Sequence, residues 1–210
     1  MVKISSKTRE KYLELRNIFG YYSGMLSENV SSADNQQERV PMDVENLKWY
    51  LAGFVDGEGC FSVTVCRNKY TKLHWKIDPL FQVYQHKDNA NILHIFKKVM
   101  QCGYVSEKGG NPVCHVYCVD RISDLLGKVI PFFNDYPLVG EKYNNFLLFK
   151  QIVEGIYQNK HRTSEGLIEL TKVAFKMNRN GKYRKHTLEV IIGSLEQSSE
   201  AKRQIRSNVE

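Results

Sequence analysis

The period of the hydrophobic pattern changes abruptly within residues 47–63, LKWYLAGFVDGEGCFSV, and this change constrains the fold more than any other feature. Up to Val55, apolar residues recur at the three- and four-residue spacing of one helix face. Gly57 and Gly59 then stop the helix. From Phe61 the chain alternates apolar and polar residues, as a strand with one exposed face does. The sequence therefore predicts a helix that leads directly into a strand.

The same patterns, followed along the chain, predict an α+β fold. The expected elements are a helix over 44–56, strands over 61–66 and 73–85, a helix over 88–99, a hairpin over 103–108 and 111–119, and helices near 121–130, 141–157, 164–178 and 187–196. Asp43 and Asp88 are expected helix caps, Pro79 should bend or bulge its strand, and Pro131 should end a helix. We therefore expect a four-stranded antiparallel sheet with helices on one face.

Three segments follow from this organisation. Residues 1–43 form an N-terminal extension, with a helix expected over 6–27 and a polar linker after it; residues 44–160 form the core domain; residues 161–210 form a basic helical tail. No apolar stretch reaches the roughly 18–20 residues of a membrane span, and the N-terminus lacks the apolar region of a signal peptide. We expect an intracellular protein in a reducing compartment.

The five cysteines form no CxxC pair, and their odd number favours reduced thiols. A zinc site built from Cys114, His115 and Cys118 is the alternative. It is disfavoured because structural zinc sites usually draw on a second ligand pair, which this sequence lacks.

The net charge is +7, and its distribution points to a long polyanion. Residues 60–87 contain five Lys or Arg against one acid, and residues 172–186 contain six and no acid. The face of the expected sheet that the helices leave open carries Lys, Gln, His and Tyr, which favours binding over simple solvation.

Asp56 and Glu58 lie where a helix ends, although the negative end of the helix dipole disfavours acids. Gly53 and Gly57 form a small-residue stripe on the same helix, which allows a second helix to approach closely. Tight packing within one domain is the alternative reading of that stripe. If two copies meet there, the two Glu58 carboxylates come together, and a divalent cation such as Mg²⁺ would offset their repulsion. Asp56 is expected instead to accept hydrogen bonds from backbone amides at the junction between this helix and the following strand.

Four segments resemble the LAGLIDADG homing endonuclease family. LAGFVDGEG (51–59) matches five letters of the nine-letter motif, and FQVYQ (81–85), YPLVGEKYNNF (136–146) and HRTSEGL…KMN (161–178) resemble further family segments in the same order. The resemblance implies an αββαββα fold whose saddle-shaped sheet lies in the DNA major groove. It implies Mg²⁺-dependent double-strand cleavage that leaves 3′ overhangs. One motif copy implies a homodimer acting on a pseudo-palindromic site.

The resemblance also implies roles for individual residues. Glu58 is the metal ligand together with the Gly57 carbonyl, Gln85 helps to organise the attacking water, and Lys142 supplies a basic group near the scissile phosphate. Glu141 stands where the family often has the first lysine of a pair, so the basic role falls on Lys142 or another cation. Separately, Asn89 or Lys87 is expected to stand in for a basic residue that some members place just after the second strand.

Two larger sets complete the predicted site. The expected DNA-binding residues are Ser62, Thr64, Arg67, Asn68, Lys69, Lys72, Lys76, Gln82, Tyr84, Ser106, Lys108, His115 and Tyr117. The expected dimer interface contains Leu51, Ala52, Gly53, Asp56 and Gly57.

Two alternatives keep the scaffold and drop the cleavage. An RNA maturase would bind intron RNA, and a nonenzymatic regulator would bind DNA only. Relatives with one motif are often encoded in organelle introns, so a chloroplast or mitochondrial origin is expected.

Overall fold

The computed structural model describes residues 43–178 and 184–207 of the chain. The helix predicted over 6–27 lies outside the described residues. The chain divides into two compact units, residues 1–51 and 52–210, and the division falls within helix α2 (Val44–Glu58). In the first unit the helix begins as the sequence predicts, because Oδ1 of Asp43 accepts a hydrogen bond from the Asn46 amide at 2.7 Å.

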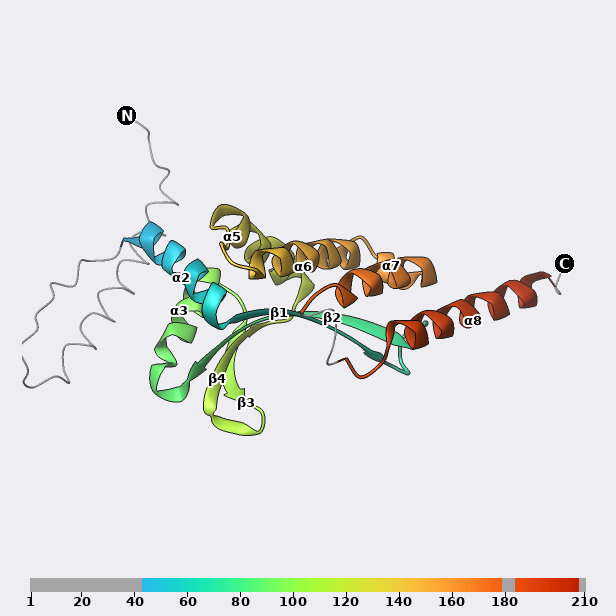
Figure 1. Cartoon of the computed structure of the whole chain (residues 1–210), viewed down its shortest axis with the longest axis horizontal. Coiled ribbons are helices and arrows are strands. Elements are labelled where there is room, and N and C mark those ends of the chain that lie inside the picture. The colour runs from blue at the N-terminus through green and yellow to red at the C-terminus, as the bar shows by residue number, and fades with distance from the viewer. Residues whose placement is uncertain (1–42, 179–183, 208–210) are drawn as a thin grey trace, which may run out of the picture. The chain divides into compact units, whose positions relative to one another are not determined.

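The second unit is built on a four-stranded antiparallel sheet, which confirms the predicted α+β fold (Figure 1). Its strands are β1 (Gly59–Arg67), β2 (Trp75–His86), β3 (Tyr104–Lys108) and β4 (Asn111–Val119). They lie in the order β1-β2-β4-β3, so β1 and β3 form the edges.

Helices pack on one face of this sheet. They are α3 (Asn91–Met100), α4 (Ile122–Asp124), the π-helix η2 (Leu125–Val129), α5 (Ile130–Asp135), α6 (Lys142–Tyr157), α7 (Ser164–Phe175) and α8 (Leu188–Ser207), with short 3-10 turns η1 (Lys87–Asn89) and η3 (Lys160–Arg162). In Figure 1, α5, α6 and α7 lie above β1 and β2, and the β3–β4 hairpin extends away from them. No described helix is long and apolar enough to cross a membrane.

An aromatic cluster holds α5 and α6 against the sheet. The Phe61 ring centroid lies 5.1 Å from that of Phe81, 5.4 Å from Phe133, 5.5 Å from Phe146 and 5.3 Å from Phe149. All five rings are almost completely buried. Such ring pairs add about 0.5–1.5 kcal/mol each beyond the burial of their area. The alternation that predicted Phe61 and Phe81 as core residues is therefore confirmed.

Pro79 does not interrupt its strand, which corrects the expected bend. The β1–β2 pairing runs without a register shift and includes Val63 opposite Pro79. The Asn68 amide donates to the His74 carbonyl at 2.9 Å, so these two residues form a hydrogen-bonded pair. Hydrogen-bonded and non-hydrogen-bonded pairs alternate along an antiparallel ladder, which makes Val63 and Pro79 a non-hydrogen-bonded pair. The backbone nitrogen of Pro79 therefore points away from β1. On that side β4 does not reach Pro79, since the β2–β4 pairing begins at Phe81. The amide that proline lacks is not needed at this point.

Two helix boundaries also differ from expectation. Pro131 lies in the first turn of α5, directly after the π-helix η2, so the helical run continues through it. A widened turn before a proline relieves its clash with the preceding carbonyls. Asp88 caps no helix through its side chain; instead Nδ1 of His86 accepts a hydrogen bond from the Asp88 amide at 3.4 Å.

The C-terminal segment covers the open edge of β1. The same alternation that turns Pro79 away from β1 leaves the Phe61 and Val63 carbonyls facing outward at this edge. Nδ2 of Asn178 donates to the Phe61 carbonyl at 2.9 Å, and Nη1 of Arg184 donates to the Val63 carbonyl at 2.6 Å. Nη2 of Arg184 also donates to the Ala174 carbonyl at 2.6 Å. Part of the basic tract over 172–186 thus protects a strand edge from pairing with other chains.

Candidate active site and nucleic-acid interface

Lys142 compensates the negative end of helix α2. The last turn of α2 contains no basic residue. The Nζ of Lys142, at the start of α6, donates to the carbonyls of Val55 at 3.0 Å, Asp56 at 2.7 Å and Gly57 at 2.7 Å. These oxygens carry the negative end of the helix dipole, so the ammonium group stabilises them. Because an ammonium group has three protons, all three donors of Lys142 are used.

Asp56 makes the reciprocal contact. Its Oδ2 accepts a hydrogen bond from the Val139 amide at 2.8 Å, and its Oδ1 accepts one from the Gly140 amide at 3.3 Å. These amides belong to the loop that precedes α6, and not to the junction between helix and strand. The acid at the end of α2 and the lysine at the start of α6 therefore lock the same two elements together.

Glu58 and Gly57 lie exposed at the end of α2 and present a carboxylate and a backbone carbonyl. Hard oxygen donors of this kind suit Mg²⁺, which keeps several waters and needs few protein ligands. The described residues contain no group of three His, Cys, Asp or Glu side chains that could hold a metal ion. This also removes the zinc alternative, since Cys114, His115 and Cys118 form no such group. The five cysteines are free, as expected; four are half-buried and Cys118 is buried.

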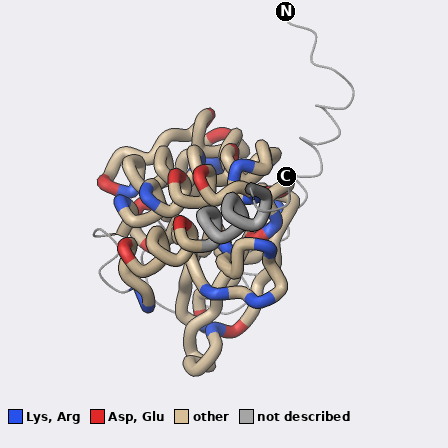
Figure 2. Tube along the Cα trace, turned by 90° about the vertical axis from the view of Figure 1, so that its right-hand side faces the viewer, with Lys and Arg blue, Asp and Glu red and all other residues tan. Residues whose placement is uncertain are grey.

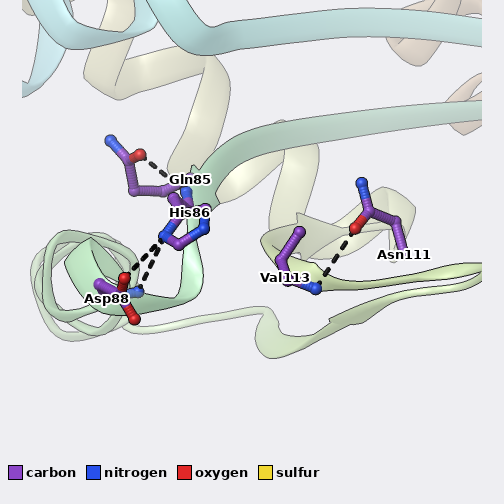
Figure 3. Close-up of polar contacts among 5 residues, drawn as sticks. All are labelled: Gln85, His86, Asp88, Asn111 and Val113. Carbon is purple, nitrogen blue, oxygen red and sulfur yellow. Dashed lines mark hydrogen bonds and ion pairs between the residues drawn. The ribbon is translucent and has the colours of Figure 1, made fainter.

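Gln85 lies near the end of β2, beside a polar cluster that the sequence analysis did not identify (Figure 3). Its Oε1 accepts a hydrogen bond from the His86 amide at 2.7 Å. Nδ1 of His86 lies 3.2 Å from Oδ2 of Asp88. His86 shares the sheet face of Gln82 and Tyr84 by strict alternation, so continuing that pattern by two residues would have found it.

The predicted dimer-interface residues divide into two groups. Gly53 and Gly57 are exposed, and a Cβ at either position would meet no atom within 4 Å. Leu51 and Ala52 are 0% and 2% exposed, so they belong to the buried side of α2 and cannot contribute a free surface. The prediction is wrong for these two because Leu51 lies four residues from both Leu47 and Val55, and Ala52 lies three residues before Val55, so both share the buried face of the helix. Asp56 is half-buried and already paired.

One face of the sheet gathers most of the predicted DNA-binding side chains. The strand register places on this outer face Ser62, Thr64, Lys76, Gln82, Tyr84 and Ser106. The Nζ of Lys108 lies 4.8 Å from the centre of the Tyr84 ring, which brings Lys108 to the same face. Lys76 pairs with Asp78 at 2.9 Å. Figure 2 shows acidic and basic positions mixed in the upper part of the view, where the helices lie, and mainly basic ones below.

Tyr117 is a correction: its side chain is 0% exposed and cannot contact DNA. It stacks on Phe96 with ring centroids 5.8 Å apart, and its hydroxyl donates to the Cys102 carbonyl at 3.0 Å. Burial raises the pKa of this phenol. The register places Tyr117 opposite Val83 of β2, which is 0% exposed, and opposite Val105 of β3, so Tyr117 shares their inner face and not the expected DNA-binding face.

By the same alternation, two further predicted DNA-binding residues do not lie on the outer face. His115 lies opposite Gln85 and Glu107, two residues from Tyr117. Arg67 ends β1 on the side of Val65, and its guanidinium lies 4.7 Å from the centre of the Trp75 ring. Neither residue shares the surface formed by Gln82 and Tyr84.

The loop between β1 and β2 carries the remaining predicted contacts. Oδ1 of Asn68 accepts a hydrogen bond from the Tyr70 amide at 2.9 Å, which shapes the turn. The Nζ of Lys69 lies 5.0 Å from the centre of the Tyr70 ring, and Lys69 and Lys72 are exposed. Lysines held on an exposed loop at one end of the sheet can reach a phosphate backbone.

Comparison with known proteins identifies this arrangement. The family model described as LAGLIDADG endonuclease matches residues 51–153. The homing endonuclease I-ApeII of Aeropyrum pernix is 30% identical over 156 residues, which cover 72% of this chain and 91% of that protein. The chain belongs to the LAGLIDADG homing endonuclease family. The archaeal intron-encoded homing endonuclease I-Vdi141I, whose structure contains DNA, matches with a TM-score of 0.69 and 29% identity over 74% of this chain and 98% of that one.

Some relatives are much longer than the region they share with this LAGLIDADG chain. A probable intron-encoded endonuclease 2 of Neurospora crassa is 35% identical over 130 residues, which cover 61% of this chain and 28% of that protein. The residues matched by the family model include the second half of α2, the sheet and most of α6. Family membership thus rests on the part of the chain that carries Glu58, Gln85 and Lys142.

Proposed function

We propose that this chain is a site-specific double-strand DNA endonuclease that acts as a homodimer. The observation that carries the proposal is the exposed Glu58 carboxylate at the end of α2. Glu58 directly follows three α2 carbonyls, which accept hydrogen bonds from Lys142. I-Vdi141I, which shares the fold, is an intron-encoded homing endonuclease crystallised with DNA. The outer face of the sheet supplies a surface on which a duplex can lie.

Each chain contributes the same parts to the proposed site. Glu58 and the Gly57 carbonyl would hold Mg²⁺, which when bound stabilises negative charge on the attacking and leaving oxygens. Gln85 would orient a water, and Lys142 would place positive charge near the phosphate. In the unbound chain the Gly57 carbonyl accepts from Lys142 at 2.7 Å, so Lys142 must release this carbonyl before the carbonyl can hold Mg²⁺. Because all three Lys142 donors are used, this release also frees the donor that a contact with phosphate requires.

The exposed glycines support the homodimer. With no side chain at Gly53 and Gly57, a second α2 can approach closely enough to bring its Glu58 near the first. Two such sites, one for each strand, would give a staggered cut with 3′ overhangs. A two-fold dimer requires a pseudo-palindromic target.

The test uses a plasmid that carries the gene hosting this reading frame, in the form that lacks the inserted intron. Purified protein with Mg²⁺ should convert the plasmid to the linear form, and Glu58→Gln should abolish this. Asp135→Asn is the matched control, because Asp135 is also an exposed acid that ends a helix. Retained cleavage by Glu58→Gln, or loss of cleavage by Asp135→Asn, would contradict the assigned role.

A further inference from the structure

Gln82 on the outer face of the sheet is held by a neighbouring tyrosine. The hydroxyl of Tyr84 donates a hydrogen bond to Oε1 of Gln82 at 2.9 Å. The two residues lie two apart on β2 and therefore share one face. Both are half-buried, so the contact is partly shielded from water.

The Tyr84 ring is itself fixed from two sides. Lys108, at the end of β3, places its Nζ 4.8 Å from the centre of the ring. Tyr84 pairs across the ladder with Val116 of β4, which is 6% exposed. Strand β4 separates β2 from β3 in the sheet, so Lys108 and Tyr84 join two strands that are not neighbours.

The Tyr84 hydroxyl keeps its proton at neutral pH. Burial raises the pKa of this phenol, and the nearby Cys60, Cys118 and Cys114 thiols raise it further. The hydroxyl therefore keeps the proton that it donates to Gln82 up to a higher pH than a free tyrosine does.

A free glutamine side chain loses rotamer freedom when it binds a base, and this loss opposes binding. A side chain that is already fixed in the unbound protein avoids much of this cost. With Oε1 engaged by Tyr84, the NH₂ end of the Gln82 amide is left for a partner outside the chain.

We propose that Tyr84 is a positioning residue for specificity: it holds the Gln82 amide so that its NH₂ group reads a hydrogen-bond acceptor on a base in the major groove. The proposal rests on the proposed function, since it assumes that the outer face binds duplex DNA. The acceptors available there are the purine N7, guanine O6 and thymine O4. Tyr84 acts on sequence preference through Gln82 and not by its own contact with a base.

The experiment measures sequence preference with cleavage removed. In a Glu58→Gln background, the full chain selects its sites from a randomised duplex pool, alone and with Gln82→Ala, Tyr84→Phe or both. Tyr84→Phe keeps the ring under Lys108 and removes only the hydroxyl. Tyr157→Phe is the matched control, because Tyr157 is 64% exposed and ends α6, away from the outer face of the sheet.

We expect Tyr84→Phe to weaken discrimination about 3- to 10-fold at the base pairs that Gln82→Ala affects and nowhere else, since it loosens the Gln82 amide but leaves the amide able to contact the base. In the Gln82→Ala background, Tyr84→Phe should have no further effect. The salt dependence of binding should not change, because no phosphate contact is removed.

Three results would overturn the proposal: an unchanged preference in Tyr84→Phe, an effect at other base pairs, or an effect that persists without Gln82. If the parent protein selects no sequence at all, the proposed function fails and this inference fails with it. An identical loss in Tyr157→Phe would show that the effect does not depend on the contact with Gln82 and would also refute the assignment.

Discussion

The Nζ of Lys142 lies 2.7 Å from the Gly57 carbonyl, so the first residue of α6 caps the end of α2. A lysine at the start of its own helix is unfavourable, because the positive end of the dipole lies there. Its long side chain instead reaches a second helix, where the sign of the dipole is reversed. The contact places a positive charge at the carbonyl that directly precedes Glu58, the residue proposed to bind metal.

Lys142→Met should destabilise the fold by about 1–3 kcal/mol, because three carbonyls lose a charged donor. Urea unfolding followed by circular dichroism measures this. Lys150→Met is the matched control on the same helix, since Lys150 makes one exposed hydrogen bond, to Asn134 at 3.2 Å. The control should stay within about 0.5 kcal/mol of the parent protein. Equal stability of Lys142→Met and the parent would show that the cap contributes nothing.

Arg184→Met should cost about 1–3 kcal/mol, because the Val63 and Ala174 carbonyls lose their donor. It should also expose the edge of β1 and promote aggregation. Unfolding curves and light scattering measure the two effects. Lys185→Met changes an exposed neighbour and should alter neither. If Arg184→Met is as stable and scatters as little light as Lys185→Met, the guanidinium does not protect the β1 edge.

His161 should make the fold less stable as the solution becomes acidic. Partial burial lowers its pKa in the folded chain below the ordinary 6.5, and the nearby Arg162 lowers it further. Because the unfolded chain then binds the proton more tightly, stability falls as the pH drops through about 6.5 towards the folded pKa, and this effect is absent above about pH 7.5. The urea midpoint of His161→Gln, measured relative to that of the parent protein, should therefore be higher at pH 5.5 than at pH 7.5. If the difference in urea midpoint between His161→Gln and the parent does not change with pH, the lowered pKa of His161 is contradicted.

Gly53→Leu should separate folding from association. Leucine is about 0.5–1 kcal/mol better than glycine inside a helix, and open space surrounds Gly53. The monomer should therefore become slightly more stable, while sedimentation should show a weaker dimer. Gly193→Leu on α8 is the control, because its Cβ also meets nothing within 4 Å. It should leave association unchanged. A Gly53→Leu dimer as tight as the parent would exclude this helix face as the interface.

Local patterns predicted most of the elements because each depends on neighbouring residues. The cap at Asp43, the alternation of Phe61 with Ser62, and the helix over 142–157 follow from spacing alone. The expectation of a bend at Pro79 was wrong because it ignored which neighbour the missing amide would face. That direction depends on the β1–β2 register and on where β4 stops.

The sequence by itself determined the α+β fold, the family and the acid at the end of α2, since a motif and its periodicity are local properties. Only the tertiary structure decided that Tyr117 is buried, that Arg184 covers a strand edge and that Lys142 caps α2. These facts depend on contacts between residues far apart in the chain. Burial, charge and hydrogen bonding across such contacts are fixed by packing, which no local period encodes.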